Sequence, residues 1–136
     1  MKKISKHEHK LLAIWAADCA EHVLLSYEKN HPGDKRPREA IEAARLWGRG
    51  AIKINEARKF AYAALASARN TVVPKAVAAA RSAGHAAATA HVPAHAKYAA
   101  LYAVKAAPNP KKEKKWQLQC LPEHLKEIIL DNYGMT

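Results

Sequence analysis

Residues 74–91 read PKAVAAARSAGHAAATAH, and this alanine-rich stretch decides the fold. Pro74 suits the first turn of a helix, where a backbone amide is not needed and the fixed φ of proline is already helical. Most of the side chains that follow are methyl-sized, which lets a neighbouring helix approach closely. The stretch therefore predicts a long helix that ends near residue 91 and lies at the centre of a closely packed helical fold.

Apolar residues recur at helical spacing on both sides of this stretch, and proline and glycine clusters separate the segments. Asn55 is expected to cap one helix through its side-chain oxygen, and Pro93 to interrupt the chain after another because it lacks a backbone donor. No strand alternation or hairpin signal is present in the sequence. Further helices are expected over residues 6–29, 37–48, 55–70, 94–106, 113–120 and 122–132.

These patterns predict an all-α fold, a single compact bundle of about five to seven helices with an alanine-rich, close-packed centre. A chain of 136 residues suits one domain, here residues 1–136. It would carry a short basic N-terminal tail at residues 1–5 and a basic linker at 108–115 before the C-terminal helical segment. The central helix should pack against the first and third helices. The expected bulky anchors are Trp15, Trp47, Phe60, Tyr98, Leu101 and Trp116.

The charge of the chain is strongly positive and unevenly distributed. Its formal net charge is +11, yet residues 57–112 contain nine Lys or Arg and no Asp or Glu. Carboxylates are common general acids, general bases and ligands for hard cations, so this stretch lacks the usual residues for such chemistry. The balance suits an acidic protein partner, nucleic acid or an anionic membrane surface, or else a solvated face without a partner.

The two cysteines, Cys19 and Cys120, are far apart and have no metal-binding spacing. Both are expected to be reduced and partly buried, as in a cytoplasmic protein. The apolar run at residues 11–17 is too short and too soon interrupted by charge for a signal peptide or an anchor. No stretch has the length and apolar character of a bilayer span.

Histidines are the chemically most versatile residues of the central region. His91 and His95 have the four-residue spacing of a two-histidine metal site, but Pro93 lies between them and no carboxylate or cysteine is near in sequence. A contact of Asp18 with His85 or His91 would resemble an acid–base pair, or would instead fix the helix register as a core hydrogen bond. We favour the structural interpretation, with no metal and no catalytic residue. The predicted polar core is Asp18, His22, His85 and His91.

Four segments of the chain together resemble a known family. They read WAADCAEHVL at 15–24, RPREAIEAARLW at 36–47, AGHAAATAHV at 83–92 and WQLQCLP at 116–122. Over residues 11–130 the sequence is similar to small, all-helical bacterial immunity proteins of the polymorphic-toxin type. The resemblance implies a helical protein that binds and neutralises a toxin, with no catalytic residues and no cofactor. Inhibitors of basic nuclease toxins tend to be acidic, so this basic chain implies a toxin with an acidic patch or one that is not a basic nuclease.

The resulting hypothesis is a non-enzymatic cytoplasmic binding protein, an immunity protein that contacts a toxin. The expected contact surface is the basic edge of the second helix, because Arg forks beside an aromatic residue are typical interface anchors. The alternative interpretation of Trp47 is that it only packs in the hydrophobic core. The alternative function is sequence-independent nucleic-acid binding through the same basic surface, and a metal-dependent enzyme on His85, His91 and His95 ranks below both. The proposed partner-binding residues are Arg36, Arg38, Arg45, Trp47 and Arg49.

Overall fold

The computed structural model describes residues 4–133, so the first three residues of the expected basic tail lie outside the described range. Within that range the chain forms eight helices and no strand, which confirms the all-α class. The helices are α1 (Lys6–His22), α2 (Leu25–Glu28), α3 (Arg36–Gly48), α4 (Ile54–Ala68), α5 (Pro74–Ala88), α6 (His95–Ala106), α7 (Pro110–Cys120) and α8 (Glu123–Tyr133).

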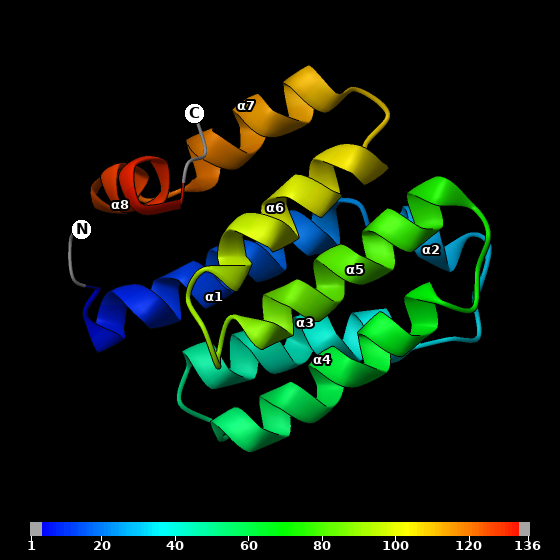
Figure 1. Cartoon of the computed structure of the whole chain (residues 1–136), viewed down its shortest axis with the longest axis horizontal. Helices are drawn as coiled ribbons and strands as arrows, with labels where there is room; N and C mark the ends of the chain where they lie inside the picture. The colour runs from blue at the N-terminus through cyan, green and yellow to red at the C-terminus, as the bar shows by residue number, and fades with distance from the viewer. Residues whose placement is uncertain (1–3, 134–136) are drawn as a thin grey trace.

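Helix α5 lies in the middle of the bundle, and α1, α3, α4 and α6 pack against it (Figure 1). The sequence predicts contacts of this helix with α1 and α4. The structure confirms both and adds α3 and α6. Helix α7 lies along α6, on the side away from α4, and α8 follows it at the end of the chain (Figure 1).

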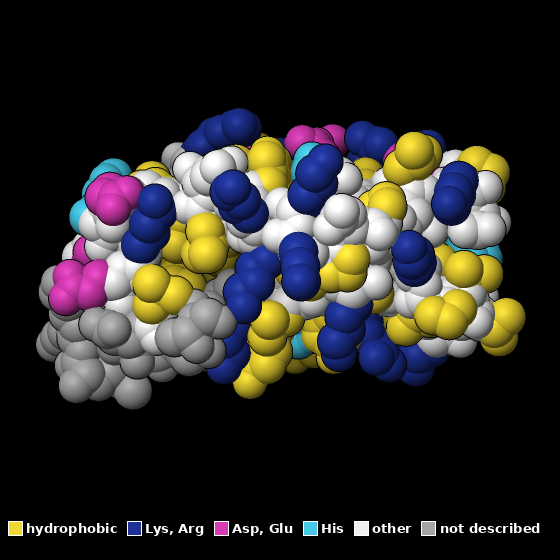
Figure 2. Space-filling model, turned by 90° about the horizontal axis from the view of Figure 1, so that it is seen from above, with side chains coloured by type: hydrophobic (Ala, Val, Ile, Leu, Met, Phe, Trp, Pro, Cys, Tyr) yellow, Lys and Arg dark blue, Asp and Glu magenta, His cyan; other side chains and the backbone are white. Residues whose placement is uncertain are grey.

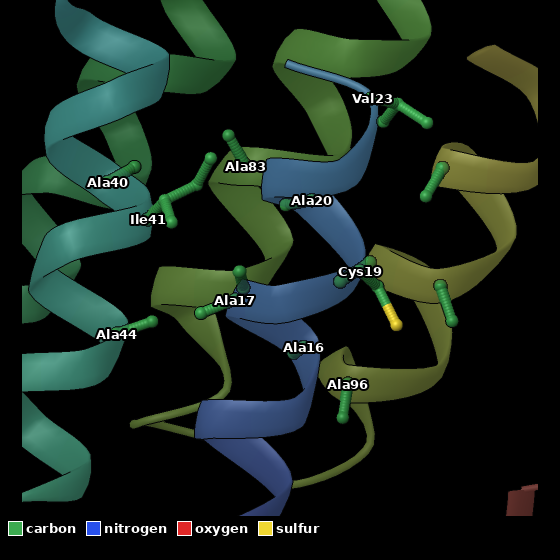
Figure 3. Packing of buried hydrophobic residues seen from close by; sticks show 14 of the residues in the cluster. Ala16, Ala17, Cys19, Ala20, Val23, Ala40, Ile41, Ala44, Ala83 and Ala96 are labelled. Atoms are coloured by element: carbon green, nitrogen blue, oxygen red, sulfur yellow. The ribbon is translucent and has the colours of Figure 1, made fainter. Parts of the chain in front are cut away.

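The centre of the bundle is built from alanine, as the sequence predicts. Figure 3 shows α1 between α3 and α6, with α5 behind it and only small side chains at most of the contacts. Because the side chains at most of these positions are no larger than a methyl group, the helix axes can lie close together. Fully buried alanines come from each of these helices and from α4: Ala16, Ala44, Ala64, Ala79, Ala83, Ala99 and Ala103.

Gly84 permits the closest approach between α4 and α5. A Cβ atom at this position would lie 2.8 Å from Leu65 and 3.3 Å from the backbone oxygen of Ala61. These contacts are shorter than ordinary van der Waals separations, so a side chain here would force the two helices to shift. The glycine thereby allows the second half of α4 to lie close beside the second half of α5.

The bulky residues correct the sequence prediction, because most of the expected anchors lie outside the core. Trp15 is 2% exposed and is confirmed as an anchor. Phe60, Tyr98 and Leu101 are 37%, 41% and 39% exposed, respectively. Their helices already present alanine to the centre at the inward positions, and the close spacing leaves no room there for a large side chain. Trp47 and Trp116 are half-buried.

The helix count exceeds the expected five to seven, partly because the first predicted helix divides. Helix α1 ends at His22 and the chain restarts as the four-residue α2, which lets both Val23 and Leu24 face the core. Helix α7 begins at Pro110, so most of the expected 108–115 linker is helical.

Three local predictions also need correction. Asn55 does not cap α4; the helix begins one residue before it, and the backbone N–H of Lys53 donates to the Glu56 carboxylate at 3.3 Å. Helix α5 ends at Ala88, three residues before the expected end. Cys19 is buried as expected, whereas Cys120 is exposed near the end of α7 instead of partly buried.

In the part of the chain that the structure describes, none of the helices is both long enough and apolar enough to cross a bilayer.

Candidate functional site

A groove lies at the end of the bundle where α3 ends, α4 begins and α5 turns into α6 (lower left in Figure 1). It consists of two adjoining depressions of about 600 Å³ and about 110 Å³ that share Arg58 and His91. We call the two together the Arg58 groove. Trp47, Lys53, Ile54 and Asn55 complete the lining of the wider part, and Ala61, Tyr62, Leu65, Ala88 and His95 that of the narrower part.

The turn between α3 and α4 creates one side of this groove. Gly50 has a φ of +79°, a left-handed conformation that side chains other than hydrogen rarely adopt. It allows the chain to reverse within a few residues, so that Trp47 at the end of α3 and Arg58 in α4 line the same depression. The sequence predicts Trp47 as a partner-binding residue, and the structure places it in this wall, half-buried.

His9 supports the Trp47 wall from α1, a role that sequence reasoning missed. Its ring is tilted against Trp47 with the centroids 4.6 Å apart. Its Nε2 donates to the backbone oxygen of Thr89, and the Thr89 hydroxyl in turn donates to the carbonyl of His85 at 2.9 Å. Segments from α1, α3 and the end of α5 are thereby tied together, and the wall is held in place before any partner arrives.

Arg58 and Tyr62 form the opposite wall and were not singled out from the sequence. They are four residues apart on α4, a spacing that places two side chains on one helix face. An Arg58 guanidinium nitrogen donates to the Tyr62 hydroxyl at 3.0 Å, and the guanidinium lies 5.9 Å from the tyrosine ring centre. No ion pair with a carboxylate holds Arg58 in the described part of the chain. Its remaining N–H donors are available for a bidentate contact with an incoming carboxylate.

His91 corrects an expectation, because it is exposed at the groove instead of buried against another helix. Helix α5 ends at Ala88, and the His91 N–H donates to the Ala88 carbonyl at 3.0 Å in a turn. The helical periodicity that placed His91 on the inner face therefore does not extend to it. Within the described residues, no three His, Cys, Asp or Glu side chains are grouped so as to hold a metal ion.

His85 pairs with His95 in place of the expected Asp18. The two Nδ1 atoms are 2.9 Å apart, and His85 also stacks on Tyr102 with the ring centres 5.4 Å apart. One Nδ1 must donate and the other accept, so the accepting ring is neutral in this contact. The pKa of His85 is lowered from 6.5 to about 4, chiefly by burial, with smaller contributions from the nearby His95 and Arg81. Burial, followed by His91, also lowers the pKa of His95.

This histidine pair predicts that acid destabilises the fold. The unfolded chain binds more protons than the folded one between about pH 6.5 and pH 4, so the stability present above pH 6.5 is lost as the pH falls through this window. We expect the free energy of unfolding to decrease by about 1 kcal/mol between about pH 7.5 and pH 5, a value reduced because the ring is partly exposed. Urea denaturation at the two pH values measures it. His85→Gln should lose most of this pH dependence, and an unchanged dependence would contradict the assignment.

The basic edge of α3 differs from the groove because its arginines already have carboxylate partners. Arg36 forms two side-chain hydrogen bonds with Asp34, at 2.9 and 2.7 Å, and Arg38 forms two with Glu28, at 2.8 and 2.6 Å. Arg36 holds the pKa of Asp34 well below its usual range, and Arg38 lowers that of Glu28. Any further carboxylate would have to displace these partners before it could bind the same guanidinium groups.

Arg45 of α3 forms ion pairs with α1, and one of its partners there is Asp18. It donates to Asp18 at 2.8 Å and to both oxygens of Glu21 at 3.0 Å, and it lowers the pKa of Glu21. Asp18 is therefore an ion-pair partner and does not meet a histidine among the described contacts. Arg49 is exposed and has no ion pair within residues 4–130. Trp47 and Arg49 are thus the members of the predicted surface that remain available.

His22 forms a second polar cluster at the opposite side of α1. Its Nδ1 donates to Glu113 at 2.7 Å, and its ring stacks on Trp116 with centroids 3.7 Å apart. This carboxylate–imidazole pair resembles the arrangement of a general base. Cys120 lines the adjacent depression, but burial raises the pKa of its thiol, with Asp18 and Glu113 adding to the effect. The thiol is therefore protonated near neutral pH, and the cluster fastens α7 to α1.

A face of α5 and α6 carries cations stacked on tyrosine. The Lys97 ammonium lies 4.8 Å from the Tyr98 ring centre, and Tyr102 has Lys105 at 5.1 Å and Arg81 at 5.7 Å. None of these cations is paired with a carboxylate in the described structure. Figure 2, which looks onto the side of α6 and α7, shows Lys and Arg spread across the surface and acidic side chains confined to its left end and upper edge.

The chain matches a family model described as "Imm-5 like putative immunity protein". The match covers residues 2–124, which is most of the chain and includes every residue of the Arg58 groove. The comparisons with curated proteins and with solved structures gave no match.

Proposed function

The chain belongs to the family of Imm-5 like putative immunity proteins, and on this premise we propose that it binds a bacterial toxin and neutralises it without catalysing a reaction. Family membership over residues 2–124 is the observation that carries the proposal. The toxin presents an acidic surface, since this chain has a net charge of +11 and like charges at an interface disfavour binding.

The Arg58 groove is the proposed contact site. Tryptophan, tyrosine and arginine are the residue types most enriched among the side chains that dominate binding energy, and Trp47, Tyr62 and Arg58 occur together here. Of the five residues predicted from the sequence, we assign direct contact to Trp47 and Arg49. Arg36, Arg38 and Arg45 would orient α3 through the carboxylates they already bind.

The cytoplasm is the proposed location. An immunity protein acts where the toxin would damage the producing cell, and thiols remain reduced in that compartment. Both cysteines are free in the structure.

A growth assay tests the proposed function. A candidate toxin gene from the genomic neighbourhood of the gene for this chain is expressed from an inducible promoter in a sensitive bacterium, with or without the present protein. We expect colony counts to return nearly to those of cells without toxin, and the two purified proteins to elute as one complex. Cell death despite accumulation of both proteins would contradict the proposal.

Nucleic-acid binding is the second candidate, and the cation–tyrosine face of α5 and α6 favours it. Lysine and arginine attract phosphates irrespective of sequence, and exposed aromatic rings can stack on bases. A fluorescence titration with a generic DNA duplex and a generic RNA at two salt concentrations separates the two functions. Micromolar affinity that falls steeply with salt supports this candidate. If neither nucleic acid binds at the lower salt concentration, binding of a protein toxin remains as the proposed function.

A further inference from the structure

The narrower part of the Arg58 groove has the dimensions of a receptacle for one side chain. Its volume is about 110 Å³, and a cavity of about 150 Å³ in another protein is large enough to hold benzene. Ala61, Leu65 and Ala88 make its lining largely apolar. An aliphatic side chain of the size of leucine therefore fits, and its burial would remove apolar surface from water.

The rim of this cavity is positively charged and contains no carboxylate. Arg58 lies where the two depressions meet, and Lys53 lines the wider one. Residues 57–112, which supply every other residue of the cavity, have no Asp or Glu. Arg58 donates one hydrogen bond to Tyr62 and keeps further N–H groups for a ligand. A basic or neutral segment would find no complementary charge at this rim.

We propose that the groove recognises an acidic protein segment that inserts one aliphatic side chain between α4 and the α5–α6 turn, with flanking carboxylates on Arg58 and Lys53. The inference rests on the proposed function and specifies what the toxin presents to this site. The apolar cavity selects the inserted side chain, and the Arg58 fork selects the acidic neighbours. Trp47, held by His9, covers the part of the segment that crosses the wider depression.

A peptide titration followed by amide NMR shifts of the full chain tests this inference. The first probe is the acetylated, amidated peptide Glu-Glu-Leu-Glu-Glu, and the second carries alanine in place of leucine. We expect the leucine peptide to bind roughly tenfold more tightly, since burial of the larger side chain removes more apolar surface from water. The amides of Ala61, Leu65 and Ala88 should shift. Equal affinities, or shifts confined to residues 36–45, would overturn the inference.

Two variants with matched controls separate charge from shape. Arg58→Glu should weaken binding of the leucine peptide by about tenfold or more, whereas Lys59→Glu should change it less than about twofold because the side chain is exposed and lines neither depression. Ala88→Leu should fill the cavity and abolish the preference for leucine. Ala63→Leu changes another half-buried alanine outside the groove and should preserve that preference. Equal effects of a variant and its control would contradict the proposal.

A third probe and the growth assay complete the test. If a ten-nucleotide oligo-dT strand shifts the same amides at lower concentration than the leucine peptide, the site is a nucleic-acid site and the inference is wrong. In the growth assay, failure of the wild-type chain to protect counts against the proposed function. Protection by the wild type and equally by Arg58→Glu counts against this inference alone.

Discussion

Replacing Trp15 with alanine is expected to lower the free energy of unfolding by about 4 kcal/mol, the cost of removing a large aromatic side chain from a core. The side chain is 2% exposed and is the largest of the fully buried ones. Its indole N–H donates to the backbone oxygen of Gln117 at 2.9 Å, which fastens α7 to α1. The helices of this core are held at fixed distances by close alanine contacts, so we expect most of the cavity to persist.

Guanidinium denaturation followed by circular dichroism measures this loss. Trp15→Phe serves as the control, because it keeps a buried aromatic ring and loses the hydrogen bond and only part of the indole, at an expected cost of about 1–2 kcal/mol. A loss below about 1.5 kcal/mol for Trp15→Ala would mean that the core relaxes around the site. Trp15 would then not be the anchor that the structure indicates.

Enlarging a central alanine should be nearly as damaging as removing Trp15. Ala83 is fully buried on α5 and lies near Ile41 of α3 and Ala20 of α1 (Figure 3). Ala83→Leu adds three carbons where three helices meet, and such overpacking costs about 3 kcal/mol when the backbone must move. The Arg58 groove would also change, because Ala88 at the end of α5 lines its narrower part.

The melting temperature measures this effect, with an expected decrease of roughly 10 °C for a chain of this size. Ala51→Leu is the matched control, since Ala51 is exposed in the turn after α3 and should tolerate the same change with little effect. An unchanged melting temperature for Ala83→Leu would show that the helices separate without cost. The close packing through alanine would then not determine the arrangement.

The helices were readable from the sequence because their signals are local. Pro74 and Pro37 mark helix starts within one residue of those observed, and the expected fifth helix agrees with α6 to within one residue at its start. The end of α1 before Val23 could not be predicted from the sequence. It depends on two adjacent side chains that both face the core, and no punctuating residue marks it.

The outward position of bulky residues follows from packing and not from helical periodicity. Phe60 lies next to Ala61 in sequence, and a hydrophobic pattern alone favours the larger residue for the core. Gly84 lets α5 approach α4 so closely that a Cβ atom there would collide with Leu65 and press on the backbone oxygen of Ala61. The distance between two helices cannot be obtained from the hydrophobic pattern of either helix alone.

Only part of the candidate site could be predicted from the sequence. Trp47 was predicted, and the absence of acidic residues from 57–112 indicated where positive charge would remain unpaired. Arg58 and Tyr62 had a detectable signal in their four-residue spacing. His9 had none, since it lies 38 residues before Trp47 and reaches it only through the packing of α1 on α3. The pairing of Arg45 with Asp18, 27 residues away, was unreadable for the same reason.

Hydrogen–deuterium exchange of the complex with the toxin identified in the growth assay tests most directly whether the Arg58 groove is the contact site. We predict that toxin binding slows amide exchange in residues 47–62 and 88–95, which line the groove. Residues 36–45 and 108–119 should exchange at the rates of the free protein. Slowed exchange confined to the ion-paired arginines of α3, or to the His22–Trp116 cluster, would contradict this account.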